Sequence, residues 1–176
     1  MNAPGRIRVI GGTLRNSRIE VPDLPGLRPT SDRVRETLFN WLQPVIEGSR
    51  CLDLFAGTGA LGIEALSRGA AAVTFVEREP RLAAALKANL ARLKVGGEVV
   101  GDDAARWLGG AARPFDLVWL DPPFALDAWA ETAKKLEDGG WLAAHAWIYV
   151  ESPRGAAFAL PHNWHAHRQG QAGEVA

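Results

Sequence analysis

The feature that most limits the fold of this chain is a glycine-rich turn between a strand and a helix. Residues 51–55 (Cys51-Leu52-Asp53-Leu54-Phe55) have the pattern of a buried strand, and Gly57-Thr58-Gly59-Ala60-Leu61-Gly62 follows almost directly. Ile63–Ser67 then continues as a helix. Glycine allows the tight turn and the close packing that such a junction needs. This stretch therefore predicts a parallel sheet with helices packed against it.

Strands and helices alternate along the rest of the chain. Strands are expected at residues 72–76, 98–100, 115–120 and 146–150, and residues 164–168 are a candidate sixth strand. Helices are expected at residues 80–94, 104–108 and 126–136, the last of them ended by Gly139-Gly140. This alternation predicts an α/β protein with a Rossmann-like, doubly wound and mainly parallel sheet.

The N-terminal part follows a different pattern. β-Branched residues and a pair of glycines predict a β-hairpin over residues 6–21. A proline-rich connector follows, and Thr30 or Ser31 can cap a helix that Pro44 is expected to end. We therefore divide the chain into an N-terminal hairpin arm with its connector, residues 1–29, and a main domain, residues 30–176.

The distribution of charge is more informative than the net charge, which is zero over 176 residues. The first 35 residues contain seven arginines, no lysine and three acids. Arginine suits phosphate because its planar guanidinium donates two hydrogen bonds at once. The arm is therefore a candidate phosphate contact, and a solvated basic edge is the alternative interpretation. The seven arginines are Arg6, Arg8, Arg15, Arg18, Arg28, Arg33 and Arg35.

Several other features limit the function. Cys51 is the only cysteine, which excludes an internal disulfide and favours a reducing, cytoplasmic setting. No apolar run is long enough to span a membrane, and the N-terminus lacks the core of a signal peptide. His162, His165 and His167 cluster near the C-terminus, but no cysteine or acid completes a ligand set, so no metal site is expected. Nothing in the sequence requires more than a monomer.

The motif Asp121-Pro122-Pro123-Phe124 follows the apolar run 115–120, where the two prolines end the predicted strand. In open α/β sheets, ligands bind at the edge where strands end. The Asp121 carboxylate and the proline-locked carbonyls are acceptors for the two N–H groups of a planar amine, and Phe124 can stack on the base that carries it. The alternative is a tight turn with a solvated aspartate.

The glycine turn admits two kinds of cofactor. It matches the G-x-G-x-x-G pattern of dinucleotide sites, and Glu77 lies 20 residues after Gly57, where that pattern expects a ribose-binding acid. A nicotinamide-dependent oxidoreductase is therefore a rival. Asp53 favours a different cofactor, because a carboxylate before the turn repels a pyrophosphate and attracts the sulfonium and amino groups of S-adenosylmethionine. Bonding of Asp53 to local backbone amides is the alternative.

A site for S-adenosylmethionine can be assembled from the loops that follow the first three strands of the predicted sheet. Gly57 and Gly59 let the backbone approach the methionine part, and Glu77 can accept from the ribose hydroxyls. Asp103 can accept from the adenine amine. The complete set of expected cofactor contacts is Asp53, Phe55, Gly57, Gly59, Glu77, Asp103 and Ala104.

Four segments of this sequence resemble the bacterial RsmD-type 16S ribosomal RNA guanine-N2 methyltransferases. They are residues 8–12 (Arg-Val-Ile-Gly-Gly), residues 27–42 (from Leu-Arg-Pro-Thr-Ser to Asn-Trp-Leu), residues 53–62 (from Asp-Leu-Phe-Ala to Leu-Gly) and Asp121-Pro122-Pro123-Phe124. The resemblance implies methyl transfer from S-adenosylmethionine to the exocyclic N2 amine of one guanine in the small-subunit RNA, naked or in partly assembled subunits. It also implies that Asp121 and the Pro122 carbonyl orient the amine, that Phe124 stacks on the base, and that the arginines contact RNA phosphates.

Two alternatives remain beside the nicotinamide enzyme. An adenine-N6 nucleic-acid methyltransferase would use the same chemistry at residues 121–124, and a catalytically silent RNA-binding relative would keep the arm alone. The resemblance also implies a longer C-terminal segment than residues 172–176 provide. The last strand of the sheet is therefore expected to be shortened, at an edge-strand cost.

Overall fold

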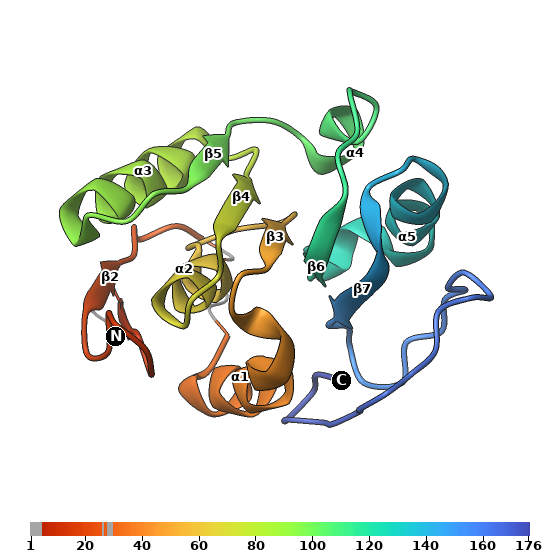
Figure 1. The fold of residues 1–176 in the computed structure, drawn as a ribbon, viewed down its shortest axis with the longest axis horizontal. Coiled ribbons are helices and arrows are strands. Elements are labelled where there is room, and N and C mark those ends of the chain that lie inside the picture. Colours follow the sequence, from red (N-terminus) through yellow and green to blue (C-terminus); the bar gives the residue numbers. More distant parts are fainter. Residues whose placement is uncertain (1–4, 26, 28–29) are drawn as a thin grey trace.

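The computed structural model describes residues 5–25, 27 and 30–176 (Figure 1). At its centre is a five-stranded sheet in the order β5-β4-β3-β6-β7, in which every pair of neighbours is parallel. The strands are β3 (Arg50–Asp53), β4 (Ala72–Val76), β5 (Glu98–Val100), β6 (Phe115–Leu120) and β7 (Leu142–Val150). The predicted Rossmann-like α/β fold is confirmed, and strands β4, β5 and β6 have the predicted bounds.

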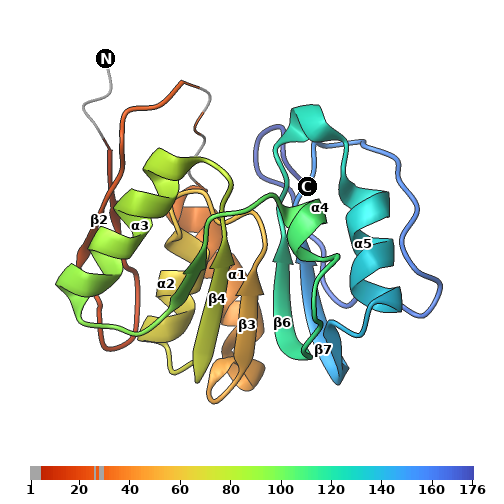
Figure 2. The ribbon, with the colours of Figure 1, turned by 90° about the horizontal axis from the view of Figure 1, so that it is seen from above.

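Helices cover both faces of this sheet, because successive strand residues point to opposite sides. On one face, α1 (Asp32–Ile46), α2 (Ala60–Ser67) and α3 (Pro80–Leu93) share a core cluster with Phe75 and Trp119. On the other face, α4 (Ala104–Trp107) and α5 (Trp129–Asp138) pack on Leu52 and Val118 (Figure 2). The adjacent residues Val118 and Trp119 thus belong to different layers of the protein.

The N-terminal segment forms the predicted hairpin. Strands β1 (Arg6–Arg8) and β2 (Arg18–Glu20) pair antiparallel, with Ile7 opposite Ile19. Both isoleucines are buried and belong to the same core cluster as α1, α2 and α3. On α3, the Asn89 side chain accepts from the Glu20 N–H (3.1 Å) and donates to its carbonyl (2.9 Å), so the hairpin is docked beside this helix (Figure 2). The arm therefore packs as part of the main core.

Three local predictions were wrong. Pro44 lies inside α1, which runs on to Ile46, so the proline stands in the last turn of the helix and does not end it. The helix expected at residues 126–136 is present as α5 and ends before Gly139 as predicted, but its start was placed too early: α5 begins at Trp129, after a short 3₁₀ turn, η1 (Phe124–Leu126). Asp127 separates the two because its φ is +46°, in the left-handed region.

The third wrong prediction is the sixth strand at residues 164–168. Trp164 instead follows a turn, in which its N–H donates to the Pro161 carbonyl (3.0 Å), and its ring packs on the α4 and α5 side of the sheet. In the part of the chain that the structure describes, β7 is followed only by the isolated bridges Pro153↔Val175 and Ala172↔Val175. No described strand therefore pairs with the outer edge of β7.

Candidate active site

The structure brings four acidic residues to the same edge of the sheet. Because β3, β4, β5 and β6 are parallel, their carboxyl ends meet there. Asp53 is the last residue of β3, and Glu77 directly follows β4. Asp103 caps α4 just beyond β5, and Asp121 directly follows β6. The chain thus places the predicted cofactor residues and the predicted catalytic aspartate at neighbouring strand ends.

The glycine turn leaves its backbone open at one position and is packed at another. Gly57 and Gly59 have φ of +57° and +80°, and Gly59 N–H closes the turn on the Ala56 carbonyl (2.8 Å). A Cβ atom at Gly57 would meet nothing within 4 Å, whereas one at Gly59 would lie 2.3 Å from a Leu86 methyl group on α3. Gly57 therefore leaves room for a ligand to approach the backbone, and Gly59 allows the turn to pack on α3.

Two backbone N–H groups, one of them in the glycine turn, hold the Glu77 carboxylate in place. Its Oε1 accepts from Gly57 N–H (2.8 Å) and its Oε2 from Glu79 N–H (2.9 Å). A carboxylate has about four lone-pair sites, so acceptor capacity remains for the hydroxyl groups of a ribose. The half-buried position of Glu77 beside the open face of Gly57 fits such a ligand.

The remaining predicted cofactor residues differ in exposure. Asp103 is exposed and accepts from the Arg106 N–H (3.1 Å), so it serves as the N-cap of α4. Ala104 beside it is buried, and Phe55 is half-buried against the α4 and α5 side of the sheet. Their contact with a cofactor stays a prediction.

Asp53 has a different environment from the one expected. Its side chain is buried and accepts from the Gly62 N–H (3.2 Å), which is the local arrangement considered as the alternative. Burial raises the pKa of Asp53 to about 8, against an opposing effect of the Gly62 hydrogen bond. The carboxyl is then mostly protonated at neutral pH. Burial thus opposes the charge that was expected to repel a pyrophosphate, and the contact of Asp53 with a cofactor stays a prediction.

Asp121-Pro122-Pro123-Phe124 is surrounded by aromatic side chains. Asp121 is half-buried, Pro122 is buried, and the Phe124 ring lies 5.9 Å from the ring of Trp129 on α5. On the neighbouring strand, Tyr149 donates to Glu151 Oε1 (2.8 Å). Sequence reasoning missed this pair, although its own prediction of a strand ending at Val150 puts Glu151 at the same edge.

Of the seven arginines proposed to contact RNA, five are exposed. Arg6 and Arg8 share one side of β1 and form exposed ion pairs with Glu20 (3.5 Å) and Asp32 (3.8 Å), and such pairs contribute little to stability. The exposed arginines are Arg6, Arg8, Arg15, Arg18 and Arg33. Arg28 lies outside the described residues.

Arg35 is a correction to the predicted RNA contacts. Its side chain is fully buried, and its guanidinium donates to Asp32 (2.5 Å), to Glu64 (3.4 Å) and to the Arg8 carbonyl (2.9 Å). Because these three bonds hold the Arg35 side chain inside the protein, it cannot reach a phosphate. Arg35 instead joins α1 to the hairpin and to α2.

Glu64 is a further residue that sequence reasoning missed. It is fully buried on α2, and its two oxygens accept the N–H groups of Ile10 and Gly11 (2.9 Å each). It also pairs with Arg68 (2.8 Å) and Arg35. A glutamate within the apolar sequence of α2 was the available signal. Glu64 thus fastens the hairpin to the helix that begins at the glycine turn.

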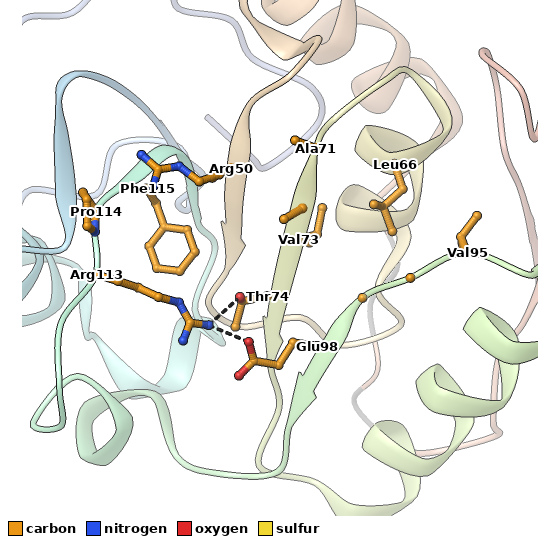
Figure 3. Close-up of a pocket in the computed structure, with 13 residues that line it drawn as sticks. Arg50, Leu66, Ala71, Val73, Thr74, Val95, Glu98, Arg113, Pro114 and Phe115 are labelled. Atoms are coloured by element: carbon orange, nitrogen blue, oxygen red, sulfur yellow. Dashed lines mark hydrogen bonds and ion pairs between the residues drawn. The ribbon is translucent and has the colours of Figure 1, made fainter.

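A hollow of about 710 Å³ opens at the opposite edge of the sheet, where the strands begin (Figure 3). Arg113 lines it and donates to Thr74 (3.0 Å) and Glu98 (2.6 Å). The hollow contains none of the predicted site residues, and its two arginines are paired with acids, Arg113 with Glu98 and Arg50 with Asp116. Among the described residues, no cluster of three or more His, Cys, Asp or Glu side chains could hold a metal ion, and no helix could cross a membrane.

Comparison with known proteins identifies the family. The model of the family described as "Conserved hypothetical protein 95" matches residues 7–176. The ribosomal RNA small subunit methyltransferase D of Escherichia coli K12 is 52% identical over 174 residues, which cover 98% of this chain and 88% of that protein. The chain belongs to this methyltransferase family. The Haemophilus influenzae protein of the same name is 44% identical, with 93% of this chain and 87% of that protein covered.

Solved structures agree with this family membership. A structure from Escherichia coli described as a methyltransferase has a TM-score of 0.91 and 48% identity, and the match covers 97% of this chain and 94% of that one. A methylase structure from Haemophilus influenzae has a TM-score of 0.83 and 39% identity, covering 97% and 95%. The methyltransferase fold expected from the resemblance is confirmed.

Proposed function

We propose that this protein transfers a methyl group from S-adenosylmethionine to the N2 amine of guanine 966 in 16S ribosomal RNA. The observation that carries the proposal is the position of Asp121-Pro122-Pro123-Phe124, which leaves the sheet beside the strand that leads into the open glycine turn. Relatives named for methylation of small-subunit ribosomal RNA support the class of substrate.

The residues at the sheet edge fit the cofactor. Gly57 offers an open backbone to the methionine part, Glu77 offers carboxylate oxygens to the ribose, and Asp103 offers an exposed carboxylate to the adenine amine. Bound S-adenosylmethionine would supply a methyl group on a cationic sulfur, and this sulfur leaves as a neutral thioether when a nucleophile attacks the methyl carbon. A cation near Asp53 would also favour the charged form of that carboxyl.

The motif after β6 would hold the target amine. The N2 lone pair of guanine is delocalised into the ring, so the amine is a poor nucleophile. Asp121 and the Pro122 carbonyl accept its two N–H groups and orient the nitrogen toward the methyl group. As the N–C bond forms, the amine releases one of these protons, for which the Asp121 carboxylate is the acceptor at hand. Phe124 stacks on the base, an interaction worth about 1–3 kcal/mol. The guanine is unstacked to reach this position.

The exposed arginines of the hairpin would contact RNA phosphates. They lie on a rigid part of the molecule, because the buried Ile7 and Ile19 tie the hairpin to the main core. A ribosomal RNA substrate supports a cytoplasmic location, and we propose that the enzyme acts there as a monomer.

Mass mapping of small-subunit RNA methylated in vitro tests this function. The expected product is a single methyl group on the N2 amine of guanine 966, with S-adenosylhomocysteine as the second product. Naked RNA and partly assembled subunits are compared, so that the same experiment identifies the substrate form. A methylated adenine would instead support the adenine-N6 alternative, and binding of NADH in place of S-adenosylmethionine by calorimetry would support an oxidoreductase.

A further inference from the structure

Glu151 lies next to the proposed catalytic motif. In the pairing of β6 with β7, Leu120 is opposite Val150, and the Glu151 N–H donates to the Leu120 carbonyl (3.1 Å). Strands β6 and β7 lie side by side (Figure 1). Asp121 and Glu151, which directly follow them, are therefore at adjacent positions of the sheet edge.

Tyr149 holds the Glu151 carboxylate. Its hydroxyl donates to Glu151 Oε1 (2.8 Å), which shows that Tyr149 and Glu151 lie on the same face. Burial raises the pKa of Tyr149 most strongly, and the charges of Glu151 and Asp121 raise it further. Asp121 is thus close enough to Tyr149 to influence its ionisation, and the phenol stays protonated as a donor at neutral pH.

The backbone of Glu151 is held as firmly as its side chain. The indole N–H of the buried Trp129 donates to the Glu151 carbonyl (2.8 Å), and only 9% of Glu151 is exposed. The carboxylate is therefore a preorganised acceptor, with one oxygen fixed by Tyr149 and acceptor capacity on the other.

The chemistry of guanine calls for an acceptor at this place. Its N1–H lies directly beside the N2 amine, whereas adenine and 2-aminopurine carry a lone pair at N1. Asp121 and the Pro122 carbonyl account for the two N–H groups of the amine in the proposed function. The N1–H then needs its own acceptor, because burying a donor without one costs the free energy of its lost hydration.

We propose that Glu151 is a specificity residue that accepts the N1–H of the target guanine, and that Tyr149 is a positioning residue that holds this carboxylate. The inference rests on the proposed function and adds how the site distinguishes guanine from other purines. Against a purine with a lone pair at N1, the carboxylate presents a second acceptor, and the two repel each other.

Small-subunit RNA carrying 2-aminopurine tests this inference, because that base keeps the amine and lacks the N1–H. The target guanine is located first by mass mapping, and the modified RNA is built by ligation. For the wild-type enzyme we expect kcat/KM to be at least about 100-fold lower on 2-aminopurine than on guanine. Glu151→Gln, whose amide can donate to N1, should reduce this ratio by at least about tenfold.

Tyr149→Phe keeps the carboxylate and removes its fixed donor, so we expect a smaller fall in the ratio, about threefold to tenfold. It also provides a second test if Glu151→Gln does not fold. Glu47→Gln is the matched control, because Glu47 is exposed after α1 at the opposite end of the sheet. This control should keep the wild-type ratio.

The outcomes distinguish failure of the proposed function from failure of the role of Glu151. A wild-type enzyme that does not methylate guanine N2 at all refutes the proposed function, and the inference with it. A wild-type enzyme that accepts both bases equally overturns the inference alone. The same conclusion follows if Glu151→Gln lowers both rates in parallel, or if the ratio is unchanged in Glu151→Gln or Tyr149→Phe.

Discussion

Arg35 and Glu64 form an ion pair in which both side chains are fully buried, with 3.4 Å between Nη1 and Oε1. Arg35 comes from the first helix and Glu64 from the helix after the glycine turn. Arg35 also donates to the Arg8 carbonyl, and Glu64 accepts two N–H groups of the hairpin's Ile10 and Gly11. The pair therefore joins the proposed RNA arm to the helix that follows the proposed cofactor turn.

Glu64→Ala should be strongly destabilising. Among the described residues, the substitution leaves Asp32 as the one acidic partner of the buried Arg35 guanidinium, and it removes the acceptor of two backbone N–H groups. Loss of one partner of a buried pair costs about 3–5 kcal/mol in free energy of unfolding. Urea denaturation measures this cost, and Glu47→Ala at an exposed position is the control. A loss below about 1 kcal/mol would contradict the role assigned to Glu64.

Asp121→Asn should abolish methyl transfer while S-adenosylmethionine binds with an affinity within a few-fold of wild type. Asparagine keeps the size of the side chain but removes its charge, and one of its terminal groups becomes a donor that opposes the amine N–H. Single-turnover kinetics and calorimetry give the two quantities separately. Turnover close to wild type would remove Asp121 from the catalytic assignment.

Asp53→Asn should change how stability depends on pH. Burial raises the pKa of Asp53 from 3.8 to about 8 in the folded protein, so the folded state keeps a proton that the unfolded state releases. Asp53 therefore lowers the free energy of unfolding progressively as pH rises between those two values. Asparagine does not titrate, so we expect the variant to gain at least about 1 kcal/mol relative to wild type between about pH 5 and about pH 8.5.

Urea denaturation at several pH values measures this difference. Asp23→Asn is the control because Asp23 is exposed, and its stability curve should run parallel to that of wild type. If the Asp53→Asn curve is also parallel to wild type, Asp53 does not hold a proton in the folded state.

Neutralising the hairpin arginines should weaken RNA binding without unfolding the protein. The arm cannot be tested by deletion, because its Ile7 and Ile19 belong to the main core. The double variant Arg15→Gln and Arg18→Gln changes only exposed side chains. Each lost phosphate contact should reduce the slope of log affinity against log salt by about 0.7–0.9.

Arg50→Gln is the control for charge, since Arg50 is exposed at the start of β3, at the opposite edge of the sheet. RNA affinity is measured by filter binding at several salt concentrations. If the double variant and the control have the wild-type slope, the arm does not contact the phosphates.

The parts of the molecule that depend on local sequence patterns could be predicted from the sequence. Alternating strands and helices, the hairpin and the four acids at the strand ends follow from periodicity and from the rule that parallel strands end at one edge. The state of an individual side chain depends on burial by segments distant in the chain. Arg35 could not be placed for this reason, because its partner Glu64 comes from α2. The bond of Asp53 to Gly62 is local and was one of the two predicted arrangements, but the full burial of the carboxyl depends on the packing of the whole sheet.

Gly57→Ala and Gly59→Ala should separate cofactor binding from stability. Both glycines have positive φ, so each alanine costs about 1–2 kcal/mol in backbone strain. At Gly59 the added methyl group would also lie 2.3 Å from Leu86, whereas at Gly57 it would meet nothing within 4 Å. Gly59→Ala should therefore lower the free energy of unfolding by clearly more than this backbone strain alone. Gly57→Ala should stay folded and lose affinity for S-adenosylmethionine, because its methyl group occupies the open approach to the turn. Urea denaturation and calorimetry with S-adenosylmethionine measure the two effects, and wild-type affinity in Gly57→Ala would place the cofactor elsewhere.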